Sequence, residues 1–150
     1  MCLSIAINRP DDVLANGEHL GFEWMIIHNR IGYRCGYVKV PPGHPWHGKY
    51  SSDLDADVHG GLTFAEADVP CDAGGQDNGH WLGFDCAHSC DMPDATLPMD
   101  GDGCAYHDTM NRIFDLYKGD YSAGVRTQEY VEGECRKLCE QAHAATAGNP

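Results

Sequence analysis

The chain has 150 residues, of which 42% are hydrophobic and 22% charged, and its formal net charge is −13. This length and composition predict one globular domain, residues 1–150, with a core of its own. The acidic charge argues against polymeric nucleic acid and membrane surfaces as partners, because proteins that bind them carry clustered Lys and Arg. A small anionic ligand is compatible with this charge where a local cation or a nest of backbone N–H groups holds it.

The N-terminal segment and the cysteines indicate the compartment. The apolar part of that segment is too short for a secretory signal, and no apolar run approaches the roughly 20 residues of a membrane helix. We expect a cytoplasmic protein whose eight cysteines stay free thiols in a reducing environment. No cysteine pair has the C-x-x-C spacing of a zinc ribbon, so a four-thiolate zinc site is not expected.

A β-hairpin is predicted in the first third of the chain. Residues 8–20 are polar and predict a lead-in loop or a short helix. Residues 21–28 are rich in aromatic and β-branched side chains, which favour a strand. A turn over residues 29–32 leads to a returning strand over residues 33–40, which two prolines end because proline cannot donate to a β-ladder.

The middle of the chain alternates loops with short elements. Their predicted ranges are 44–57 for a loop, 58–64 for a strand broken by two glycines, 68–79 for a second loop, 80–87 for a strand, 89–103 for a third loop and 112–118 for a short helix. In the strand over 80–87, alternation places Leu82, Phe84 and Cys86 on the face that we expect to point to the core.

The strongest element is a C-terminal helix. Thr127 is its predicted N-cap, with Gln128 and Glu129 in the first turn, and Gly148 lies beyond its end. An apolar stripe recurs at helical spacing: Val131, Cys135, Leu138, Cys139 and Ala142. Strands come first and the main helix last, which predicts an α+β fold, an antiparallel or mixed β-sheet with this helix packed on one face.

Two segments are rich in side chains that can bind a metal or transfer a proton. In His59-Gly60-Gly61-Leu62-Thr63, the glycine pair is typical of a place where a ligand or another backbone approaches closely; the alternative is a β-bulge or a tight bend. The second segment is His80-Trp81-Leu82-Gly83-Phe84-Asp85-Cys86-Ala87-His88, followed by Asp91. At the end of a strand, Asp85 and His88 suit metal ligation or acid–base chemistry; the alternative is that Asp85 caps a turn and His88 is merely exposed.

The loop before these segments is a candidate ligand wall. It carries two histidines and two aromatic side chains, His44, Trp46, His47 and Tyr50, and aromatic rings offer flat stacking surfaces. The alternative is a loop that Trp46 anchors to the body of the protein.

Several motifs together resemble a known group of proteins. They are Gly36-Tyr37-Val38, His44-Pro45-Trp46, HGGLT at 59–63, WxGFDCAH at 81–88 and Glu129-Tyr130-Val131. This pattern, over residues 32–141, resembles small uncharacterised proteins encoded by tailed bacteriophages. The resemblance implies a phage or prophage origin, a location in the host cytosol and a shared site. Small phage proteins often act against the host, including on nucleotide signals of its defence.

Our first hypothesis is a small metal-assisted hydrolase that acts on a nucleotide or another phosphoester. His59, Asp85 and His88 would hold a divalent metal, zinc or another, with Asp91 or His47 as an outer ligand or proton carrier. Residues 44–91 contain one basic residue, Lys49, against nine acidic ones. A phosphate here would therefore need a metal, glycine-loop amides, or Arg30 and Arg34 from the hairpin.

Two alternatives belong to other classes. One is a non-catalytic protein that binds and sequesters a nucleotide-type ligand, an anti-defence sponge, in which Trp46, Tyr50 and Trp81 stack on a base. The amides of Gly60 and Gly61 would then hold phosphate, and Thr63 would contribute a hydroxyl. The other is a protein-interaction module that acts through its acidic surface.

Overall fold

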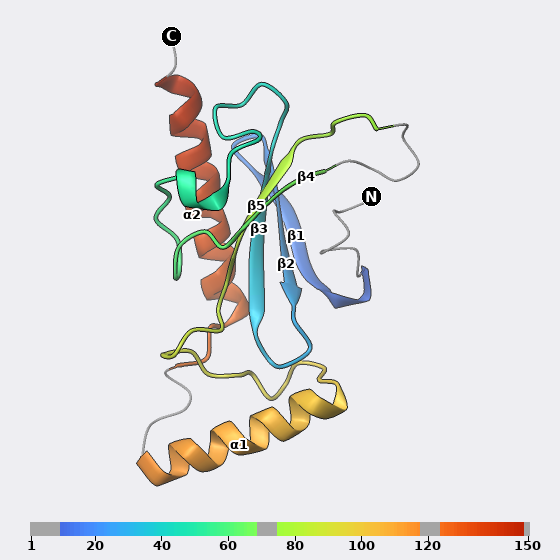
Figure 1. Ribbon diagram of the computed structural model, residues 1–150, viewed down its shortest axis with the longest axis vertical. Helices are drawn as coiled ribbons and strands as arrows, with labels where there is room; N and C mark the ends of the chain where they lie inside the picture. The colour runs from blue at the N-terminus through green and yellow to red at the C-terminus, as the bar shows by residue number, and fades with distance from the viewer. Residues whose placement is uncertain (1–9, 69–74, 118–123, 149–150) are drawn as a thin grey trace.

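The computed structural model describes residues 10–68, 75–117 and 124–148 (Figure 1). Its centre is a five-stranded antiparallel sheet with the order β1-β2-β3-β5-β4. The strands are β1 Val13–His19, β2 Phe22–His28, β3 Arg34–Val40, β4 Phe64–Ala67 and β5 His80–Asp85. The two α-helices are α1 Gly101–Tyr117 and α2 Gln128–Ala147. Because α2 packs on β2 and β3, the predicted α+β fold is confirmed.

The main core lies between α2 and one face of the sheet. All five stripe residues of α2 are fully buried, and they meet the buried side chains Phe22, Trp24, Ile26, Val38, Val40, Leu82, Phe84 and Cys86. Gly36 allows this close approach, because a Cβ there would stand 2.4 Å from the Phe84 ring and 2.8 Å from the sulfur of Cys135. The predicted core face of β5 is therefore confirmed.

The hairpin and the final helix form for the local reasons that the sequence predicted. The side chain of Asn29 accepts hydrogen bonds from the backbone N–H groups of Ile31 and Tyr33, which closes the turn between β2 and β3. The hydroxyl of Thr127 accepts a hydrogen bond from the amide of Tyr130, and so caps α2. Gly148 follows α2 as its C-cap.

Two predicted elements were wrong, and a third was too short. Residues 13–19 are a strand and not a loop or helix: β1 pairs with β2 through a tight turn in which Leu20 and Gly21 have positive φ. Residues 58–63 are not a strand, because Gly60 and Gly61, with φ of 68° and 82°, turn the chain and β4 begins only at Phe64. The short helix over 112–118 is instead the longer α1, which begins inside the predicted loop 89–103. Part of the predicted loop 68–79 lies outside the described residues.

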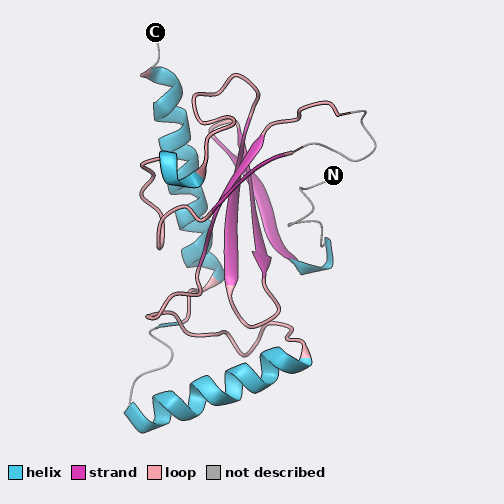
Figure 2. Ribbon diagram, viewed as in Figure 1, coloured by secondary structure: helices cyan, strands magenta, loops and turns pink. Residues whose placement is uncertain are grey.

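One end of the sheet carries α1 and the loop that follows β5. Figure 2 shows loops and α1 at the end where β2 and β5 finish and β3 begins. Tyr106 of α1 contacts Tyr33 there, with 3.0 Å between the two hydroxyl oxygens. Within the described residues, neither helix is both long and apolar enough to span a membrane.

Candidate metal centre

The candidate site is a cluster of His59, His88 and Asp91 beside the first turns of α2. His59 lies in the turn before β4, and the other two residues lie in the loop that follows β5. One ligand atom from each residue can be chosen so that all three lie within 4.8 Å of one another. The structure thus brings together the two strand-end segments that the sequence singled out.

Asp91 is the centre of the cluster. Its Oδ2 atom lies 2.8 Å from Nε2 of His59 and 3.2 Å from Nδ1 of His88. The same oxygen accepts a hydrogen bond of 2.9 Å from the backbone N–H of His88, and the Asp91 N–H donates back to the His88 carbonyl at 2.9 Å. This small turn fixes the carboxylate between the two imidazoles.

The Asp91 carboxylate stays ionised although its side chain is 0% exposed. Burial raises its pKa, but hydrogen bonds from the His59 ring, the Arg126 guanidinium and a backbone amide together lower it to about 2. Arg126 makes the shortest of these contacts, 2.7 Å from its Nε to Asp91 Oδ1. A negative charge is therefore available to a cation at any neutral pH.

Two residues of α2 orient His59. Its backbone N–H donates to the carboxylate of Glu134 at 2.7 Å, and its Nδ1 lies 3.0 Å from the hydroxyl of Tyr130. The Tyr130 ring meets the His59 imidazole edge to face. The Arg126 guanidinium lies over the Tyr130 ring, 5.2 Å from its centroid. The Nε2 atom of His59 is consequently held toward Asp91.

Gly60 makes room for His88. A Cβ at Gly60 would stand 2.1 Å from Cε1 of the His88 ring, closer than any side chain tolerates. The glycine pair forms the tight bend that was the alternative interpretation, and the group close to Gly60 is the His88 imidazole rather than a ligand or another backbone. Gly61 has open space at its Cβ position and a positive φ that favours glycine.

The three residues fit a divalent ion with N and O ligands. Around a tetrahedral zinc ion with bonds of roughly 2.0–2.2 Å, ligand atoms stand about 3.3–3.6 Å apart. The distances of 2.8 and 3.2 Å to Asp91 Oδ2 need to open by a fraction of an ångström, and the distance between the two histidine nitrogens, at most 4.8 Å, must also adjust to this range. Ligation through Nε2 would leave the Nδ1 proton of His59 to donate to Tyr130, the outer contact that metal-bound histidines commonly make. The His88 side chain is 36% exposed, which leaves a side for substrate.

Asp85, the predicted third ligand, lies outside this cluster. Its Oδ2 accepts from the Thr63 hydroxyl at 3.1 Å and its Oδ1 from the backbone N–H of Ala87 at 3.1 Å. The nearest approach to His88 is 4.0 Å, between Oδ1 and Nε2. Asp85 thus caps the turn after β5, and Asp91 takes its place between the histidines.

The residues of the predicted ligand wall are placed elsewhere. His44 donates from Nε2 to the carbonyl of Ala142 at 2.9 Å and accepts at Nδ1 from the amide of Trp46, and burial lowers its pKa. Trp46 packs against the core, and His47 pairs with Asp77 at 2.8 Å. These contacts anchor the loop to the body of the protein. The alternative interpretation, in which Trp46 serves as an anchor, is therefore the one that fits. Tyr50 is 75% exposed.

Two further residues do not suit the roles that the sequence suggested. Trp81 is 0% exposed on the sheet face opposite α2, so it presents no ring to a ligand. The Gly61 amide donates to the carbonyl of Val58 at 2.9 Å and is not free to hold phosphate.

Sequence reasoning missed Arg126, Tyr130 and Glu134. A signal was present, because residues four apart on a helix share one side, and these three follow one another at that spacing around the N-terminus of α2. They lie beside the apolar stripe, where polar residues are expected anyway. Nothing in their pattern indicated that this row would face His59.

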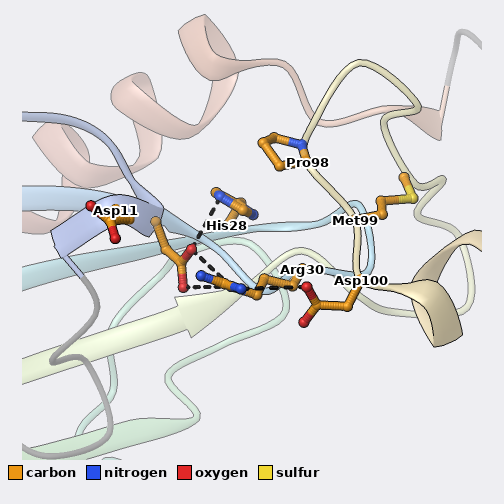
Figure 3. Close-up of a pocket in the computed structure, with 7 residues that line it drawn as sticks. Asp11, His28, Arg30, Pro98, Met99 and Asp100 are labelled. Atoms are coloured by element: carbon orange, nitrogen blue, oxygen red, sulfur yellow. Dashed lines mark hydrogen bonds and ion pairs between the residues drawn. The ribbon is translucent and has the colours of Figure 1, made fainter.

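A separate cavity of about 240 Å³ lies near the same end of the sheet. His28, Arg30, Pro98 and Met99 are among the residues that line it (Figure 3). Oδ1 of Asp12 lies 3.5 Å from Nε2 of His28. Nε of Arg30 lies 2.9 and 3.1 Å from the two carboxylate oxygens of Asp12. This pair neutralises a buried carboxylate and ties the segment before β1 to the turn after β2.

Comparison with family models, curated proteins and solved structures gave no match to this chain. The resemblance to small phage proteins therefore stays a prediction, and the argument for function depends on the site's own geometry.

Proposed function

We propose that this protein is a metal-dependent hydrolase in which His59, His88 and Asp91 hold one divalent ion, with zinc as the first candidate. The observation that supports the proposal is the buried, ionised Asp91 carboxylate with an imidazole nitrogen at 2.8 Å and another at 3.2 Å. Three protein ligands with a further position left for water or substrate are typical of catalytic zinc sites, whereas structural sites use four.

The roles of the residues follow from their contacts. A bound ion would supply a water of lowered pKa and would polarise an oxygen of the substrate. Tyr130 and Glu134 fix the orientation of His59, and Arg126 fixes Asp91. Asp85, a carboxylate outside the ligand set but next to His88, suits the acceptance of a proton from the attacking water.

A phosphoester, including a nucleotide, is the substrate class that we propose. The chain is strongly acidic, so an anionic substrate requires local positive charge. The ion and Arg126 would provide it at one place. The phage resemblance agrees with a nucleotide substrate of host origin. Sequestration without cleavage receives less support, since Trp81 is buried and the Gly61 amide is occupied.

The test is metal binding and turnover by matched variants. Metal-free protein is titrated with zinc by calorimetry and then assayed with p-nitrophenyl phosphate and bis-p-nitrophenyl phosphate. We expect one zinc per chain, and a loss of zinc affinity of about a hundredfold or more in His59→Ala and His88→Ala, beyond the cost of losing an outer contact. His143→Ala removes an exposed histidine of α2 and should behave as wild type. Wild-type protein that takes up no zinc, manganese, iron or cobalt would exclude the proposed function.

A further inference from the structure

Arg126 has binding capacity that its contacts within the protein do not use. Its Nε donates to Asp91, and its side chain is 26% exposed. Among the described residues, no acceptor lies within hydrogen-bonding distance of its two terminal nitrogens. A guanidinium carries five N–H donors in a planar fork, so four of them remain available beside the proposed metal centre.

The backbone of Arg126 is fixed in place. Its carbonyl accepts a hydrogen bond of 3.0 Å from Arg34, whose Nη1 also lies 2.8 Å from a carboxylate oxygen of Asp94. One residue earlier, Val125 forms a β-bridge with Met92, and the Met92 N–H donates to the carbonyl of Gly124 at 2.8 Å. Arg126 is thus held at both ends, at its backbone by Arg34 and at its Nε by Asp91.

The charge around Arg126 favours an anion once an ion is bound. Asp91 and Arg126 cancel each other, Glu134 is paired with Lys137 at 3.1 Å, and Asp85 beside His88 adds one negative charge. A divalent ion would therefore leave local positive charge, which the first turn of α2 increases through its helix dipole. This would be a positive site on an otherwise acidic protein.

We propose that the free edge of Arg126 binds the terminal phosphate of the substrate, with two phosphate oxygens on the guanidinium and a third directed to the metal. This inference rests on the proposed function and narrows its substrate class from phosphoesters in general to phosphomonoesters. A monoester phosphate has three non-bridging oxygens, enough for both partners. A phosphodiester has two non-bridging oxygens and a carboxylate has two oxygens. Neither can therefore give two oxygens to the guanidinium and a third to the metal. Bidentate pairing to phosphate is the geometry that distinguishes Arg from Lys.

The experiment measures anion binding to protein that already holds zinc. Each variant is loaded with one equivalent of zinc, freed of excess by gel filtration, and titrated by calorimetry with inorganic phosphate, dimethyl phosphate and acetate as probes. The variants are Arg126→Gln, which removes the charge and the fork, and Arg126→Lys, which keeps the charge alone. Arg136→Gln is the matched control, because it removes the same charge from an exposed position on α2, the helix that follows Arg126.

We expect wild type to bind phosphate at least tenfold more tightly than dimethyl phosphate or acetate. Phosphate affinity should fall at least tenfold in Arg126→Gln, fall less in Arg126→Lys, and stay within about twofold in Arg136→Gln, since a charge-assisted bidentate pair is lost only at Arg126. Phosphate binding that is equally tight in wild type and Arg126→Lys would overturn the inference, even if the Gln variant does not fold. Dimethyl phosphate or acetate binding as tightly as phosphate would overturn it as well. Failure of the wild type to take up zinc would instead remove the proposed function itself.

Discussion

At the scale of single residues, Asp91 explains why two histidines from distant parts of the chain converge. Its buried oxygens are shared among both imidazoles, a backbone amide and Arg126. A buried charge is costly unless every lone pair finds a partner, and here both oxygens do. The same arrangement makes Asp91 a stabilising residue as well as a candidate ligand.

The first prediction concerns acid. Because the folded pKa of Asp91 is lowered to about 2, its ionisation contributes stability that is present above pH 4 and is lost as the pH falls toward 2. The difference in unfolding free energy between wild type and Asp91→Asn should shrink by about 2 kcal/mol over that interval. Urea denaturation of metal-free protein at pH 6, 4, 3 and 2.5 measures it. A difference that is constant with pH would contradict this assignment.

The sequence predicted the site's histidines better than its carboxylate. His59 and His88 were recognised because each lies next to a glycine or a strand end. Asp91 was assigned only an outer role, since strand alternation describes β5 but not the turn after it. That turn brings Asp91 back to His88, three residues earlier, through a hydrogen bond from the Asp91 N–H to the His88 carbonyl. Arg126 comes from 35 residues away, a pairing that no local pattern reveals.

At the scale of elements, α2 serves the core and the site at once. Its apolar stripe packs on the sheet, while Tyr130 and Glu134 reach His59. Changes in the stability of this helix should therefore alter the whole fold, but they should affect metal affinity only when they move Tyr130 or Glu134.

A pair of substitutions in α2 tests this statement. Thr127→Ala removes the N-cap and should lower the unfolding free energy by about 1 kcal/mol. Gly133→Ala should raise it by about 0.5–1 kcal/mol, because a Cβ there meets no atom within 4 Å. Urea denaturation measures both, and zinc titration of Gly133→Ala should match wild type. If both substitutions changed the unfolding free energy in the same direction, the stability of α2 would not determine the stability of the fold.

The elements that sequence predicted correctly are those with strong periodicity or clear end signals. The β2–β3 hairpin has a run of buried residues and the Asn29 turn, and α2 has a cap and a stripe. β1 was missed because it is an edge strand in which apolar and polar residues do not alternate along the sequence and none is fully buried. β4 was displaced because two consecutive glycines in a turn resemble, in one dimension, a strand with a bulge.

At the scale of the whole molecule, the sheet order places the candidate centre at one end. β5 is flanked by β3 and β4, so the loop after β5 and the turn before β4 emerge next to each other. Composition predicted an α+β domain, but it could not supply this order. The net charge alone predicted that the protein repels anions, whereas the folded chain exposes part of the Arg126 side chain beside the candidate metal centre.

Metal binding should therefore stabilise the entire fold. A ligand that binds only the native state adds about 2.7 kcal/mol at a concentration a hundredfold above its Kd, which corresponds to roughly 5–10 °C in Tm for a chain of this size. Thermal unfolding with and without zinc measures the shift, and a chelator should reverse it. His59→Ala should show no shift and His143→Ala a full one. An equal zinc effect in both variants would mean that the ion binds elsewhere.

The position of α2 in the chain also affects when the site can be completed. His59 is translated 75 residues before Glu134, its partner on α2. At 5–20 residues per second, a ribosome needs about 4–15 s to cover that interval. For that time the nascent chain carries an imidazole without the helix that orients it. The three proposed ligands precede α2 in the chain, so the site should reach its full metal affinity only after the residues of α2 that orient His59 have been synthesised.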